Sequence, residues 1–117
     1  MKYANKQSRY LKTKEKLLRD HDGACSGCGM YKPSEGSHRI PRSLCIGSSL
    51  EPLYWDPNNI DLFCRDCHNK MNQPAMLELN NFAEILAYYE KISLTTVAGN
   101  MYIRPLYQRT KLYAKGL

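Results

Sequence analysis

Two Cys-x-x-Cys pairs, Cys25 with Cys28 and Cys64 with Cys67, constrain this chain more than any other feature of its sequence. A spacer of two residues lets both sulfurs of a pair turn toward one point, so two pairs supply four thiolates to a single tetrahedral zinc ion. Such a site has no open coordination position and stabilises the fold instead of taking part in a reaction. We therefore expect a fold organised around a structural zinc ion.

The length of 117 residues favours a single domain, whose small hydrophobic core benefits from a structural metal. The sequence has no apolar run long enough to span a bilayer, and its first residues are polar and rich in Lys, so we expect an intracellular protein without membrane contact. Reduced, metal-binding thiolates fit that location better than disulfides do. We expect the fifth cysteine, Cys45, to be a small buried residue.

The charge of the chain favours a polyanionic partner. It carries 17 Lys and Arg against 11 Asp and Glu, a net charge of +6. Nucleic acid is favoured over a membrane surface, although composition alone fits a merely soluble basic protein equally well. The basic residues gather toward the two ends: residues 1–20 are rich in Lys and Arg, and no acidic residue follows Glu90.

The spacing of apolar residues predicts helices on both sides of the cysteine pairs. Residues 1–20 are expected to contain a basic amphipathic helix, and residues 74–92 a second one that begins at Pro74. Residues 93–117 interleave Tyr with Lys and Arg, which suits stacking and phosphate contact in a nucleic-acid groove, and equally a loosely packed basic tail.

Short elements are predicted between these helices. A strand over residues 37–43 and a strand end over residues 60–63 are expected to form the arms of a hairpin, with a loop over residues 44–52. A short helix is expected from residue 64 to residue 70, with Cys67 and His68 on its first turn.

Three further residues surround the cysteine pairs in a fixed order. His38 lies in the run Ser-His-Arg-Ile-Pro, Asn59 stands five residues before Cys64, and His68 directly follows Cys67. Together with the cysteines this pattern resembles the HNH endonuclease family, and within it the small phage-type proteins. The resemblance covers roughly residues 19–73.

The resemblance implies a zinc-stabilised ββα-metal finger. With the helices that the spacing of apolar residues predicts on either side, we expect an α+β fold in which this finger has flanking N-terminal and C-terminal helices. The whole chain, 1–117, is expected to be one HNH nuclease domain. Its parts are a basic helical extension (1–20), the finger (21–73), an amphipathic helix (74–92) and a basic, Tyr-rich tail (93–117).

The resemblance also implies a DNA endonuclease that hydrolyses phosphodiester bonds. His38 matches the family's general base, which takes a proton from water. His68 matches a ligand of a catalytic divalent ion, Mg²⁺ or Mn²⁺, which stabilises the leaving oxygen. Asn59 matches the residue that ties the hairpin and helps orient the base. The zinc ligands are then Cys25, Cys28, Cys64 and Cys67, and a phage-encoded chain would act in the cytoplasm of the host cell.

The chain departs from the family at Ser37, where many members have Asp or His as a second metal ligand. Asp61 is a candidate replacement, since it shares strand parity with Asn59. The candidate phosphate contacts are Arg39, Arg42 and Arg65.

Two alternatives remain open at this point. The first is a noncatalytic, zinc-bound DNA-binding module, which fits Ser37 and the basic flanks. The second is a zinc-stabilised adaptor that binds another protein through the apolar helix after Pro74. The apolar helix faces are also compatible with a homodimer.

Overall fold

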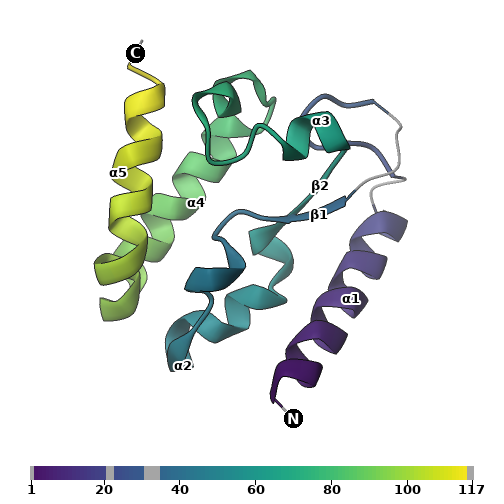
Figure 1. The fold of residues 1–117 in the computed structure, drawn as a ribbon, viewed down its shortest axis with the longest axis vertical. Helices are drawn as coiled ribbons and strands as arrows, with labels where there is room; N and C mark the ends of the chain where they lie inside the picture. The colour runs from purple at the N-terminus through teal and green to yellow at the C-terminus, as the bar shows by residue number, and fades with distance from the viewer. Residues whose placement is uncertain (1, 21–22, 31–34, 116–117) are drawn as a thin grey trace.

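The computed structural model describes residues 2–20, 23–30 and 35–115, so residues 21–22 and 31–34 of the predicted finger lie outside this description. Helices surround a small two-stranded antiparallel sheet, which confirms the predicted α+β class (Figure 1). Strand β1 (Glu35–His38) pairs with β2 (Ile60–Phe63), and Ser37 lies opposite Asp61. This hairpin is the centre of the molecule.

Helix α1 (Lys2–Asp20) lies along one side of the hairpin (Figure 1). It is attached through Tyr10, which is 4% exposed, and through Thr13, whose hydroxyl donates a hydrogen bond of 2.7 Å to the carbonyl of Trp55. Leu11, the next residue after Tyr10, is half exposed. One side of this basic helix therefore packs on the domain, as its periodicity predicts.

The connection between the strands is helical, where a loop was predicted over residues 44–52. It contains a 3₁₀ turn (Arg42–Leu44), α2 (Gly47–Leu50), and two more 3₁₀ turns (Glu51–Tyr54 and Pro57–Asn59). These turns form because they bury apolar side chains, namely Leu50, Leu53 and Tyr54. Strand β1 ends at His38, earlier than predicted, because β2 begins only at Ile60, after the Pro57–Asn59 turn, and the N–H of Ile40 bonds the side chain of Asn59 instead of a strand backbone.

The predicted helix over residues 74–92 is interrupted. A 3₁₀ turn (Pro74–Glu78) is followed by an extended residue, Leu79, and helix α4 (Phe82–Thr95) begins only after it. The interruption lets the N–H of Asn80 bond the carbonyl of Gly27, at 2.8 Å, and buries Leu79 against the first cysteine pair. A contact with a distant part of the chain thus overrides the local helical pattern.

The described part of the predicted tail, residues 93–115, is largely helical rather than loosely packed. A π-helical turn (Gly99–Ile103) leads into α5 (Arg104–Tyr113), which packs alongside α4 on the other side of the hairpin from α1 (Figure 1). Leu106 and Thr110 of α5 are buried, and Tyr107 donates a hydrogen bond to Glu90 of α4. None of the described helices is long and apolar enough to cross a membrane.

Candidate metal centre and the adjacent histidine pocket

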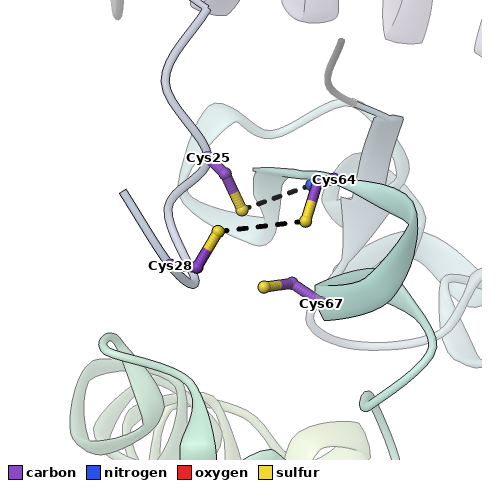
Figure 2. Close-up of side chains that lie close together, drawn as sticks. All are labelled: Cys25, Cys28, Cys64 and Cys67. Atoms are coloured by element: carbon purple, nitrogen blue, oxygen red, sulfur yellow. Dashed lines mark hydrogen bonds between the residues drawn. The ribbon is translucent and has the colours of Figure 1, made fainter. Parts of the chain in front are cut away.

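The four paired cysteines converge on one point (Figure 2). All four Sγ atoms lie within 4.8 Å of one another, and those of Cys28 and Cys64 are 3.9 Å apart. Four sulfurs at zinc-ligand distance in tetrahedral geometry stand about 3.8 Å apart. The cluster can therefore hold a metal ion such as zinc.

Two short turns bring the cysteines together. In the first turn the N–H of Gly29 bonds the carbonyl of Cys25, and in the second the N–H of His68 bonds the carbonyl of Cys64, where helix α3 (Arg65–His68) begins. A Cβ atom added at Gly27 would stand 2.9 Å from Sγ of Cys67. Glycine at this position lets the two turns close around the cluster.

The backbone around Cys25 favours a thiolate. Its sulfur accepts N–H groups from Cys64 at 3.2 Å and from Gly27 at 3.4 Å. Burial acts to raise the pKa of Cys25, but the backbone hydrogen bonds outweigh it and the pKa falls to about 7. Burial and the neighbouring thiols raise the pKa of Cys67. Four such groups ionise together only with a cation among them, so the donor set fits a structural divalent ion.

His38 and His68 line a second feature, an open pocket of about 560 Å³ beside the hairpin. They come from β1 and α3, 30 residues apart in the chain, and the lining includes Arg42, Met71 and Asn72. The structure therefore places these two predicted site residues at one surface.

The hydrogen bond of His38 defines its tautomer. Its Nε2 lies 2.7 Å from the carbonyl oxygen of Tyr54, which only accepts, so Nε2 donates and Nδ1 is the basic nitrogen of the neutral ring. Nδ1 has no hydrogen-bond partner among the described residues. Burial is the main cause that lowers the pKa of His38. The hydrogen bond to Tyr54 acts to raise this pKa, whereas the charges of Arg42 and His68 lower it further. The ring is consequently neutral near pH 7.

His68 is oriented by Glu35, a residue that the sequence did not single out. Nδ1 of His68 lies 2.7 Å from one Glu35 oxygen, and the other oxygen accepts from Arg65 at 2.7 Å. The bond to His68 is the largest cause that lowers the pKa of Glu35. A carboxylate that accepts from Nδ1 leaves Nε2 as the nitrogen able to bind a metal ion. The sequence carries no signal for this pair, because 33 residues separate its members and His68 lies in α3, outside the hairpin.

Asn59 is fully buried behind the pocket and does not line it. Its Oδ1 accepts the N–H of Ile40 at 2.7 Å, and its Nδ2 donates to the carbonyls of Leu53 at 2.9 Å and Ile40 at 3.2 Å. Ile40 lies two residues after His38, and Leu53 precedes Tyr54. These bonds hold His38 at a fixed distance from the carbonyl that it bonds.

Arg39 and Asp61 form a buried ion pair away from the histidines. Nε and Nη2 of Arg39 lie 2.9 and 2.8 Å from the two Asp61 oxygens, and Nη2 also pairs with Glu84 at 3.2 Å. The two residues line a different pocket, together with Leu17 and Asn81. Neither the phosphate contact expected of Arg39 nor the metal ligand expected of Asp61 fits this arrangement, because each group is occupied by the other.

The remaining residues that the sequence singled out differ in exposure and in whether their side chains already have a partner. Arg42 is exposed, lies 5.0 Å from the ring centroid of Tyr10, and has no acidic partner among the described residues. Arg65 is exposed but paired with Glu35, and Ser37 is buried. Cys45 is fully buried outside the cluster, as predicted, and burial raises its pKa to about 12. Within the described part of the chain, Arg42 is thus a cation at the pocket that forms no ion pair.

These two adjoining sites, the cysteine cluster and the histidine pocket, are the chemistry-bearing features of the described residues. Their function has to be inferred from their geometry. No protein-family model, no curated protein and no solved structure matches this chain.

Proposed function

We propose that this chain is a metal-dependent endonuclease of the HNH type that hydrolyses phosphodiester bonds in DNA. The hairpin and α3 would then form a ββα-metal finger around a structural zinc ion. The observation that carries the proposal is the pairing of His38 with His68 at one open pocket, where each ring has one nitrogen that no described residue bonds.

His38 serves as the general base. Nδ1 of its neutral ring removes a proton from the water that attacks the phosphorus atom. The ring becomes positive in this step, and the hydrogen bond from Nε2 to the Tyr54 carbonyl strengthens as it does so. Arg42, exposed beside the same pocket, is available to bind a phosphate of the DNA backbone.

His68 would hold the divalent ion through Nε2, since Glu35 occupies Nδ1. When bound, Mg²⁺ or Mn²⁺ supplies a Lewis acid for the charge that develops on the leaving oxygen. Asp61 is bonded to Arg39, so water and the substrate phosphate would complete the coordination shell, an arrangement that Mg²⁺ accepts.

The direct test is incubation of the zinc-loaded protein with supercoiled plasmid and with branched DNA, in Mg²⁺, in Mn²⁺ and in EDTA. We expect cleavage with one of the two ions and none in EDTA, with activity restored when the ion is returned. Zinc content is measured in every sample, because EDTA can also remove the structural ion. Folded, zinc-loaded protein that cuts neither substrate with either ion would overturn the proposal.

A noncatalytic DNA-binding module is the second candidate, and a specific observation favours it. Asp61 is unavailable as a metal ligand, and Ser37, at the position of the second ligand in many HNH proteins, is buried. DNA binding that weakens with salt, without cleavage under any metal condition, would support this candidate.

The rate of cleavage should depend on pH through His38. Burial, Arg42 and His68 lower its pKa from the ordinary 6.5, and the Tyr54 bond only partly opposes them. The base works when neutral, so activity persists below pH 6.5 and is lost as the pH falls through the lowered pKa. The measurement is kcat/KM against pH.

The control for this pH profile is Arg42→Gln. It removes a positive charge near His38 and should move the acidic limb to higher pH. An acidic limb above pH 6.5 in the parent protein would contradict the assignment of His38 as the base.

A further inference from the structure

Helix α1 lies outside the predicted finger, yet it reaches the proposed general base. The ring of Tyr10 stacks on the imidazole of His38, with centroids 5.0 Å apart and an interplanar angle of 25°. Tyr54 flanks the same imidazole at 5.3 Å in a tilted arrangement. The imidazole thus belongs to a cluster of three rings, with one aromatic side chain from α1 and one from the connection between the strands.

The position of Tyr10 is itself fixed on three sides. Its hydroxyl donates to the carbonyl of Gly36 at 3.2 Å, the guanidinium of Arg42 lies 5.0 Å from its ring centroid, and the ring of Tyr54 meets it edge-on at 6.2 Å. A Cβ atom at Gly36 would collide with the Tyr10 hydroxyl. With 4% of its surface exposed, Tyr10 is a built part of the site rather than a mobile surface residue.

We propose that Tyr10 is a positioning residue that holds the His38 imidazole with Nε2–H on the Tyr54 carbonyl and Nδ1 free at the pocket. The catalytic consequence rests on the proposed nuclease function, whereas the effect on the ring itself does not. By this proposal, α1 belongs to the active site.

The physical reason is that one hydrogen bond fixes a single atom of the ring, and not its plane. The bond to Tyr54 anchors Nε2. The stack against Tyr10 restricts a tilt of the imidazole ring that would otherwise move Nδ1 away from its place at the pocket. Small displacements of a reacting group are costly, about a hundredfold in rate for 1 Å.

The experiment compares Tyr10→Leu, Tyr10→Phe and Gly36→Ala with the parent. Two readouts are used: kcat and KM for DNA cleavage, and the ¹⁵N shifts of the His38 ring, which report its tautomer. Leucine removes the stack. Alanine at Gly36 crowds both the hydroxyl and the ring carbon that bears it, so it shifts the Tyr10 ring while His38 itself is kept. We expect kcat to fall roughly 10- to 100-fold in both variants with little change in KM, and the Nε2–H tautomer to lose population.

The conservative variant and a surface control complete the design. Tyr10→Phe keeps the stack and loses only the hydroxyl bond. Its kcat and its population of the Nε2–H tautomer should therefore stay close to those of the parent. Leu11→Ala, at a half-exposed position of the same helix, should leave both readouts unchanged. Zinc content and thermal unfolding are recorded for every variant.

The outcomes separate this inference from the proposed function. Parent values of kcat and tautomer in a folded Gly36→Ala or Tyr10→Leu protein would overturn the role of Tyr10. A changed tautomer in these variants, with no cleavage even by the parent, would support the positioning of the ring and overturn the nuclease.

Discussion

Replacing Cys64 with alanine is expected to release the zinc ion and to unfold the segment around it. Cys64 supplies one of the four clustered sulfurs and is the residue from which α3 begins, and its N–H bonds the sulfur of Cys25. Binding of zinc to such sites in zinc-finger peptides contributes about 10–16 kcal/mol, as much as the whole stability of many domains. Native mass spectrometry measures the zinc content, and thermal unfolding measures the stability.

The matched control is Cys45→Ala. Cys45 is as buried as Cys64 but lies outside the cluster, so the variant should keep its zinc and lose only the packing of one sulfur atom and its weak hydrogen bonds to the carbonyls of Ile40 and Pro41. A Cys64→Ala protein with zinc and with the parent's melting temperature would show that Cys64 is not a ligand of the ion. Zinc loss in Cys45→Ala would show that the ligand set is misassigned.

The parts of the site that could be predicted from sequence depend on short-range geometry. The Cys-x-x-Cys spacing requires each pair to form a tight turn, and the structure brings both pairs to one point. The alternation of Ile60 to Phe63 predicts a strand, and the residues after Cys64 predict a short helix. Both predictions hold because each pattern depends only on neighbouring residues. His68 follows Cys67 and is therefore placed by the same turn.

The parts that could not be predicted depend on contacts between distant residues. The interruption at Leu79 exists because the N–H of Asn80 bonds Gly27, which lies 53 residues earlier in the chain. The bond between Glu35 and His68 and the stack of Tyr10 on His38 are equally non-local. A pattern within one segment carries no information about such partners.

The expectation for Asp61 shows how a local rule can mislead. It assumed that Asn59 and Asp61 lie on one strand and share a face. Asn59 instead ends a 3₁₀ turn (Pro57–Asn59), and β2 begins only at Ile60. The alternation of strand faces does not extend across that boundary, and Asp61 bonds Arg39 away from the histidine pocket.

Replacing His38 with glutamine is expected to lower the rate of DNA cleavage by about 10²- to 10⁴-fold, the usual contribution of a general base. Glutamine can still donate to the Tyr54 carbonyl, so that acceptor is not left unsatisfied, but it has no nitrogen able to accept a proton from water at neutral pH. Zinc content should be unchanged, since His38 lies outside the cysteine cluster. Single-turnover cleavage of a labelled duplex isolates the chemical step.

His38→Ala extends this prediction, because it removes a ring that packs against both Tyr10 and Tyr54 and leaves a space beside them. Added imidazole can occupy that space and supply the missing base, so it should restore part of the activity of His38→Ala. It should not restore His38→Gln, in which the new side chain fills the space. By contrast, a His68→Ala protein should respond to a higher concentration of Mg²⁺ or Mn²⁺, because the proposed loss there is in metal binding. Cleavage by His38→Gln at the parent rate would assign the base to another group, and rescue of His68→Ala by imidazole alone would exchange the roles of the two histidines.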